Sequence, residues 1–487
     1  MRKLTTFIMV VLLMSASSAW ANDDVTTQQE IQALKTRLAE LEAKQTDQAV
    51  QQRNAELLQN MIAQMKTDAP NLSQGTGMTA GYNGGFFIKT VDDQFLLKIN
   101  GFLQFRHTYL QTDDGSSVLD AEGLKVGEPD GVDPSANGIE MVRPRLKFSG
   151  HMLGDVKYMI QTEFSDDNNN GGKLLDYMVY YSFTPEMGVK VGQFKVPFSR
   201  EYNQSAPSFM FADRGYANAV YEAGRSTGLE LFGAFDCGDT KMHYRAGMFN
   251  GLRDAGSLPL NDNDNNPAFA ARVIMPLMGA TPSDFTYESD LAYHDNAVMQ
   301  LGAGMAYANA RTEDHIAGGT DDNYVIIGKS GDGRSNSGEL GGEVTMFTAD
   351  IMYKNQGLSL ILDGYYQDSD LDSKEAAFEH DFGFSRDAFG IDGDKIQNWG
   401  WNFQAGYFLV PKEFELISRI GGVCVDSTND TMEFAGGWNW YISGQNVRIT
   451  MDVTYIDDLQ VTNGGANFHG IQNNALLLIR TQLQFTF

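Results

Sequence analysis

The last residues of the chain alternate strictly between apolar and polar side chains. One face carries Ala475, Leu477, Ile479, Thr481, Leu483, Phe485 and Phe487, and the other carries Arg480, Gln482, Gln484 and Thr486. A period of two predicts a β-strand with one apolar and one polar face. A final strand of this kind, ending on an aromatic residue, is typical of a transmembrane barrel in which the apolar face meets lipid and the polar face lines a lumen.

Short alternating runs of the same kind recur from residue 86 onward and predict sixteen strands in all. They cover residues 95–110, 140–151, 155–165, 174–184, 187–196, 226–236, 240–249, 268–276, 298–308, 343–354, 357–367, 398–409, 413–424, 431–441, 446–456 and 474–487. Their connections alternate between short turns and long loops, the long ones being 111–139, 197–225, 250–267, 309–342, 368–397 and 457–473. Short periplasmic turns and long external loops are typical of a transmembrane barrel. Residues 277–297 are an exception, because they stand where a short turn is expected.

A soluble β-sandwich or β-propeller is the alternative all-β fold. It predicts neither a lipid-facing apolar band nor a regular alternation of loop length. No later stretch approaches the roughly 18 apolar residues that a membrane helix needs, so the sequence excludes a helical membrane protein.

The first residues have the pattern of an export signal. Arg2 and Lys3 precede an apolar core and a small-residue end, Ala19-Trp20-Ala21, which predicts a signal peptide over residues 1–21.

Residues 22–68 differ from the rest of the chain because they lack Gly and Pro. The 3-4-3 spacing of Ile31, Leu34, Leu38 and Leu41 predicts a coiled-coil helix, with a frayed amphipathic helix as the alternative. Pro70 and a Gly-rich run predict a linker over 69–85, followed by the barrel over 86–487. The predicted fold class is therefore all-β: a 16-stranded antiparallel transmembrane β-barrel with an N-terminal periplasmic α-helical coiled coil.

Alternation also predicts which charged residues face the lumen. The basic pore-lining candidates are Lys98, Arg106, Arg143, Arg145, Lys147, Lys157, Lys190, Arg245, Arg272, Arg419, Arg448 and Arg480. The acidic ones are Glu163, Asp176, Glu230, Asp350, Asp363, Glu415 and Asp452. A charge on the lipid face would cost about 2–4 kcal/mol at mid-bilayer, so energy favours the same assignment. The lumen is predicted to be mixed in sign, with a basic excess in the first three strands.

The loop 197–225 combines Arg200, Arg214 and Arg225 with four aromatic residues, Phe209, Phe211, Tyr216 and Tyr221. A loop of this size and composition is predicted to fold into the lumen and constrict it. The alternative is that it stays outside as an oligomer contact.

Charge limits the classes of partner. A net charge of −27 argues against nucleic acid, since phosphate binding needs a basic surface. Loops 111–139, 309–342 and 368–397 hold 22 Asp and Glu against 7 Lys and Arg. This acidity indicates either a soluble exterior that bridges lipopolysaccharide through divalent cations or a vestibule that attracts cations.

Other chemistry finds little support in the sequence. Acidic residues of 368–379 fall at calcium-loop positions, but Ser373 replaces the usual Gly, so a solvated loop is the simpler interpretation. The seven histidines show no metal-binding spacing, and no G-x-S-x-G motif is present. His107 or His243 could face outward as part of a lipase-like pair, but no nearby residue supports this. Cys237 and Cys424 are predicted at opposite ends of the barrel, which disfavours a disulfide. We expect no enzyme, no metal and no cofactor.

Several segments resemble the phosphate-selective porin O/P family. They are GGFFIKTVDDQFLLKINGFLQFRH (84–107), VRPRLKFSGHM (142–152), LLDYMVYYSFTPEMGVKVGQFKVPFSREY (174–202) and ARVIMPLMG (271–279), with GQFKVPF (192–198) as the most specific match. The resemblance implies a 16-stranded homotrimeric barrel in the outer membrane of a Gram-negative bacterium, through which small solutes diffuse passively. The family uses arginine and lysine ladders to pass anions, which the basic lumen positions match in kind.

The combined prediction is an outer-membrane porin for small hydrophilic solutes, with anions such as phosphate preferred. One alternative is a cation-selective porin with an acidic vestibule. Another is an envelope-tethering protein in which residues 22–68, placed in the periplasm, contact the cell wall and the pore is incidental.

Overall fold

The computed structural model describes residues 77–112, 118–119, 125–126, 135–164, 172–252, 267–310, 342–371, 395–425, 430–457 and 475–487. The predicted signal peptide, the predicted coiled coil and most of the long loops, including most of 368–379, lie outside these residues. Residues 77–487 form one compact unit. Within the described part of the chain, no helix has the length and hydrophobicity to cross a membrane.

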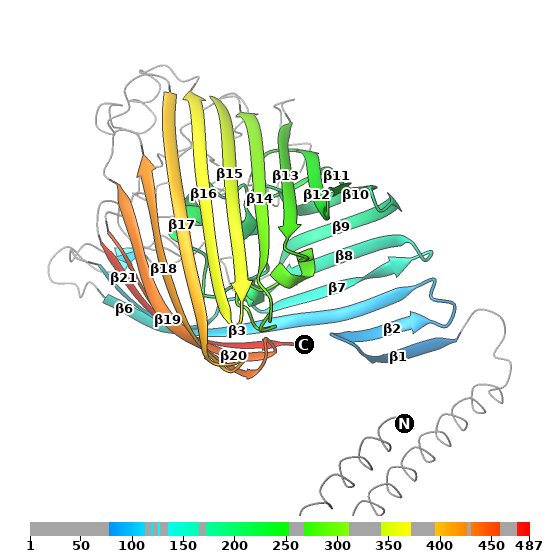
Figure 1. Cartoon of the computed structure of the whole chain (residues 1–487), viewed down its shortest axis with the longest axis horizontal. Helices are drawn as coiled ribbons and strands as arrows, with labels where there is room; N and C mark the ends of the chain where they lie inside the picture. The colour runs from blue at the N-terminus through cyan, green and yellow to red at the C-terminus, as the bar shows by residue number, and fades with distance from the viewer. Residues whose placement is uncertain are drawn as a thin grey trace, which may run out of the picture. The chain divides into compact units, whose positions relative to one another are not determined.

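Antiparallel strands form a closed wall (Figure 1). In chain order they are β3 (Leu96–Thr112), β6 (Ser135–Met141), β7 (Arg145–Met152), β8 (Val156–Glu163), β9 (Lys173–Thr184), β10 (Met187–Lys195), β11 (Arg225–Cys237), β12 (Thr240–Phe249), β13 (Ala268–Leu277), β14 (Val298–Ala310), β15 (Gly342–Asn355), β16 (Leu358–Leu371), β17 (Lys395–Val410), β18 (Phe414–Val425), β19 (Thr431–Ser443), β20 (Val447–Ile456) and β21 (Leu476–Thr486). Neighbours along this order pair with each other from β7 to β21, and β21 pairs with β3 to close the ring.

The second wall strand is split into β6 and β7, which pair with successive parts of β3. Pro144 lies at the break, where it has no backbone N–H to give to a ladder. Counted as one strand, β6 and β7 bring the described barrel to sixteen strands, as predicted.

A hairpin of β1 (Met78–Tyr82) and β2 (Phe86–Thr90) adds to this wall. β2 pairs with β3 from Phe86↔Ile99, on the edge that β21 leaves free once it ends opposite Phe102. Figure 1 shows the hairpin beside the start of β3, close to the C-terminus. β1 lies in the segment that the sequence predicts to be a linker. Its glycine-rich composition is that of a linker, and only its pairing with β2 makes it a strand.

Exposure follows the predicted alternation. On β21, Arg480, Gln482 and Gln484 are buried on the inner face, whereas Phe485 is 38% exposed on the outer face. Val179, Val191, Leu231 and many other large apolar side chains are likewise exposed around the outside. In water such a surface would be unfavourable, but it suits lipid.

Buried apolar contacts lie inside the wall. The largest cluster joins residues of the 196–224 segment, such as Val196, Phe198 and Tyr221, to inward-facing wall residues such as Met346 and Ile456. The core of this molecule is therefore formed between the wall and a segment that enters the barrel.

Candidate functional site: the barrel interior

Residues 196–224, here called the inner loop, leave β10 and return to β11 through the interior. They contain α3 (Arg200–Asn203), the 3-10 helix η1 (Ala206–Ser208) and α4 (Tyr216–Tyr221). The Ser199 hydroxyl accepts a bond from the Tyr202 amide at the start of α3, which satisfies one free N–H of that helix. Gly224 has φ 69°, a left-handed conformation that favours glycine and turns the chain into β11.

Hydrogen bonds fix the inner loop to the wall on several sides. The wall partners are Arg106 on β3, Arg272 on β13, Asp363 on β16, Glu433 on β19 and Arg448 on β20. The Arg272 and Arg448 guanidiniums donate to the carbonyls of Phe198 and Phe209, at 2.9 and 2.8 Å. Only a segment inside the ring can reach strands this far apart, so the structure places the inner loop in the lumen.

One loop carboxylate neutralises two wall arginines. Asp213 is fully buried and lies 3.1 Å from Arg106 and 2.7 Å from Arg143. Burial alone would raise the pKa of the Asp213 carboxyl, but Arg143 and Arg106 outweigh it and hold that pKa well below its usual range. Asp213 therefore stays ionised, and neither arginine presents a free charge to a solute.

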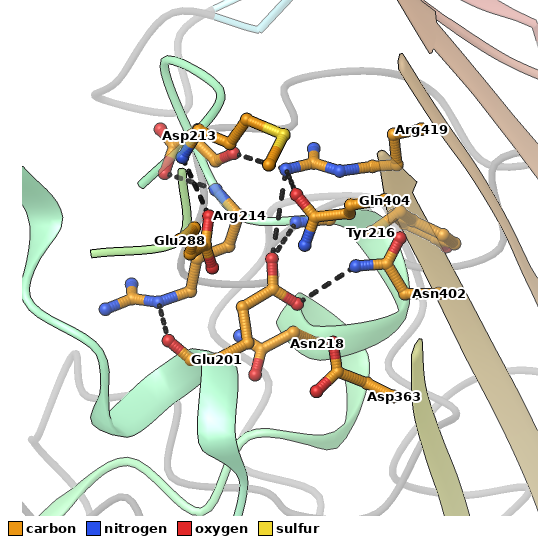
Figure 2. Close-up of polar contacts among 12 residues, drawn as sticks. Glu201, Asp213, Arg214, Tyr216, Asn218, Glu288, Asp363, Asn402, Gln404 and Arg419 are labelled. Carbon is orange, nitrogen blue, oxygen red and sulfur yellow. Dashed lines mark hydrogen bonds and ion pairs between the residues drawn. The ribbon is translucent and has the colours of Figure 1, made fainter. Parts of the chain in front are cut away.

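A second network joins the inner loop to β17–β19 (Figure 2). Arg419 lies 3.2 Å from the Glu433 carboxylate and donates to the Asp213 carbonyl at 2.9 Å. Its guanidinium also stacks 4.1 Å above the Phe211 ring. Figure 2 shows the Glu201 carboxylate between Arg419 and Asn402, which donates to it at 3.3 Å. The planar guanidinium thus satisfies a carboxylate, a carbonyl and a ring at once.

The unexpectedly long connection between β13 and β14 also enters the interior. Residues 278–297, here called the inner connection, include the 3-10 helix η2 (Pro282–Phe285). Glu288 on this segment lies 2.8 Å from Arg200 and accepts a bond from the Met210 amide at 2.7 Å. Arg200 also forms a two-point contact with Asp363 at 2.8 Å on each bond. The inner connection and the wall therefore hold the inner loop between them.

Further contacts anchor the inner connection itself. Lys354 on β15 donates to two of its carbonyls, those of Asp284 and Tyr287, at 2.8 and 2.6 Å. The Ser289 hydroxyl donates to Glu415 on β18 at 2.8 Å. The inner connection is longer than the short turn expected between β13 and β14, and its additional residues fill space in the lumen.

Most basic candidates on the far side of the barrel are covered by these two segments. Buried and bonded there are Arg106, Arg143, Arg272, Arg419, Arg448 and Arg480, together with Arg200 and Arg214 of the inner loop. Most of them pair with carboxylates, as in Arg272–Asp350 at 2.6 Å and Arg480–Asp452 at 2.7 Å, whereas Arg448 and Arg214 donate to backbone carbonyls. Desolvating these charges would be costly without such partners.

The opposite side of the barrel is more open and more basic. The inner faces of β7–β12, with the first part of β3, are here called the lysine sector. Its cations are Lys98, Arg145, Lys147, Lys157, Lys190, Lys195, Arg225 and Arg245, and its carboxylates are Glu163, Asp176 and Glu230. The pairs are Arg145–Glu163, Arg225–Asp176, Lys190–Glu230 and Arg245–Glu230.

Four lysines of this sector have no carboxylate partner among the described residues, and one of them, Lys195, donates instead to the Gln204 carbonyl of the inner loop at 2.7 Å. The other three do not contact the inner loop in this way. In the described part of the chain, no carboxylate lies within ion-pair distance of Lys98, Lys147 or Lys157, and Lys157 is exposed. The sheet register places them on neighbouring strands β3, β7 and β8, with Lys147 opposite Asn100 and Gln161.

Asp213, Glu201 and Glu288 hold the interior together but were not singled out from the sequence. Glu288 had an indirect signal, because its connection is too long for a turn. Asp213 had none beyond its position next to Arg214. Across the described residues, no group of three His, Cys, Asp or Glu side chains could hold a metal ion, and Cys237 and Cys424 are both free.

Comparison with known proteins agrees with this architecture. The anion-selective porin from Comamonas acidovorans aligns with a TM-score of 0.50 at 12% identity, covering 81% of this chain and 100% of that one. OmpT of Vibrio cholerae aligns with a TM-score of 0.48 at 11% identity, covering 81% of this chain and 98% of that one. The channel DcaP of Acinetobacter baumannii aligns with a TM-score of 0.43 at 12% identity, covering 84% of this chain and 100% of that one. No curated protein matches the sequence significantly. At such identity the first alignment supports the fold alone, and the other two add nothing to it.

A closed sixteen-stranded barrel with an apolar exterior and an inward-folded loop is the architecture of an outer-membrane porin. The family model for phosphate-selective porins O and P matches residues 116–353, which confirms the resemblance seen in the sequence. Over these residues the chain is similar to the outer-membrane porins of that family.

Proposed function

We propose that this porin prefers anions and that they pass through the lysine sector, between β7–β12 and the inner loop. The observation that carries the proposal is the charge balance of the interior. Five buried arginines of the far wall pair with carboxylates, and the sixth, Arg448, donates to the Phe209 carbonyl. Lys98, Lys147 and Lys157 have no carboxylate partner among the described residues. Unbalanced charge on a low-dielectric wall raises the local concentration of counter-ions. We therefore assign the anion selectivity to these three lysines, and not to the arginines, among the predicted pore-lining residues.

The test is the zero-current potential of the purified protein in a planar bilayer under a KCl gradient. We expect chloride preference, and we expect Lys98→Gln with Lys147→Gln and Lys157→Gln to lower the chloride-to-potassium permeability ratio about 3- to 10-fold. Lys241→Gln is the matched control, because Lys241 is 59% exposed and paired with Asp236 where β11 meets β12.

Potassium preference in the unaltered protein would contradict the proposal and would favour the acidic external loops as the source of selectivity. Chloride preference that survives the triple substitution would assign selectivity to other residues.

We further propose that residues 1–21 direct export and that residues 22–68 form a periplasmic coiled coil at the base of a homotrimer. The support is the heptad-like spacing of Ile31, Leu34, Leu38 and Leu41. Contact of this helix with the cell wall, and of the acidic loops with lipopolysaccharide, belongs to the same proposal.

Deleting residues 22–68 is expected to weaken association of the three copies and leave the conductance of each pore unchanged, because the pore lies within the barrel. The mass of the detergent-solubilised complex, measured by light scattering, checks this. If the deletion weakens the cell envelope much more than it slows solute uptake, the result favours the alternative function, in which residues 22–68 tether the envelope and transport is incidental.

A further inference from the structure

The inner face of the lysine sector is not uniformly polar. Cross-strand pairing places Met159 opposite Met178, and Lys157 opposite Tyr180. Tyr180 in turn lies opposite Lys190. All of these inward side chains keep some exposure. A lumen that serves only small hydrated ions is expected to carry polar side chains at such positions.

Two aromatic rings form the centre of this surface. The Tyr180 and Phe232 ring centroids are 6.3 Å apart with an interplanar angle of 72°. The Phe232 ring lies over Gly188, since a Cβ added there would come within 2.5 Å of its tip. Because Gly188 has no side chain, the Phe232 ring can lie against the wall. The opposite face of the ring is then turned away from β10.

Ammonium groups stand beside both rings. The Lys157 amine lies 5.9 Å from the Tyr180 centroid, and the Lys190 amine lies 5.7 Å from that of Phe232. Lys190 is committed to Glu230, but Lys157 has no carboxylate partner among the described residues. The surface therefore offers one free positive charge next to an edge-to-face aromatic pair.

We propose that this surface, formed by Lys157, Tyr180, Phe232 and the Met159–Met178 pair, is a binding site for aromatic carboxylates. The carboxylate would meet Lys157, and the solute ring would pack on Tyr180 and Phe232 in the offset or edge-on geometry that aromatic pairs prefer. The inference rests on the proposed anion preference and narrows it to monoanions with a planar apolar body.

The experiment uses the intact porin in a planar bilayer at pH 7, with benzoate and acetate as probes of equal charge. Benzoate is expected to reduce the chloride current by half at about 3- to 10-fold lower concentration than acetate. Tyr180→Ser with Phe232→Ser is expected to remove that difference and to keep chloride preference. Tyr181→Ser, on the outward face of the same strand, is the matched control and should keep the difference.

The series on the unaltered protein requires no variant to fold. Equal potency of benzoate and acetate, with chloride preferred over potassium, overturns the aromatic site and leaves the proposed anion preference standing. Potassium preference overturns both. A benzoate effect that persists in the double variant shows that the ring binds elsewhere, which also overturns the assignment.

Discussion

Replacing Asp213 by alanine is expected to destabilise the barrel by about 3–5 kcal/mol, because it leaves two buried arginines without their shared counter-ion. Arg106 and Arg143 are 2% and 7% exposed, so water cannot replace the lost carboxylate. Thermal unfolding in detergent, followed by circular dichroism, measures the change. Asp236→Ala is the control, since Asp236 is 81% exposed in its pair with Lys241, and it should leave the unfolding temperature unchanged.

The pH dependence of this contact follows from the direction of the shift. The folded-state pKa of Asp213 lies below that of the unfolded chain, so its contribution to stability is complete above the unfolded value of about 3.9 and is lost only at lower pH. The difference in the free energy of unfolding between the unaltered protein and Asp213→Ala should therefore stay constant from about pH 5 to 8 and decrease in stronger acid.

A double substitution separates the ion pair from other effects. Arg143→Met in the Asp213→Ala background should cost less than the sum of the two single changes, because the arginine is no longer left unpaired. An Asp213→Ala variant as stable as the parent would show that the inner loop is not held by this contact.

Replacing Glu288 by alanine is expected to release the inner loop on the side of the inner connection. Arg200 keeps its two-point contact with Asp363, so the cost in stability should be smaller, about 1–3 kcal/mol. The larger effect should be on the pore, since the Met210 amide loses its acceptor and the loop gains freedom to move. Single-channel recording should show higher mean conductance and added slow current fluctuations.

Asp295→Asn is the control for this experiment, because Asp295 lies on the same connection and is exposed. Steady conductance in Glu288→Ala, equal to that of the parent, would mean that the wall contacts alone fix the inner loop.

These two carboxylates show why the interior is arranged as pairs. An arginine facing the lumen but covered by a loop loses its water, and the cost of that loss exceeds the benefit of the charge unless an acid accompanies it. The inner loop does not cover Lys98, Lys147 and Lys157, so water can solvate their charges in place of a carboxylate. The free positive charges therefore occur on the side of the barrel that the inner loop leaves open.

Much of the fold could be predicted from the chain. The sixteen strands agree closely with the observed ones. The break at Pro144, the β1–β2 hairpin and the short paired strands β4 (Val118–Leu119) and β5 (Lys125–Val126) were missed. The hairpin was missed because β1 is short and rich in glycine, and its pairing with β2 depends on a partner that composition does not reveal.

The functional residues were less predictable. Arg272 and Lys157 were assigned to the same inner surface by the same alternation, yet one is buried against Asp350 and the other is exposed. Alternation gives the direction of a side chain but not what covers it.

The sequence by itself determined the barrel, because a period of two along each strand is a local property that records which face meets lipid. Tertiary structure alone decided which inward charges remain free. The contacts that cover them join residues far apart in the chain, such as Arg200 with Asp363, 163 positions away, and Arg448 with Phe209, 239 away. Such contacts form only when the ring has closed around the inner loop, and no local pattern encodes them.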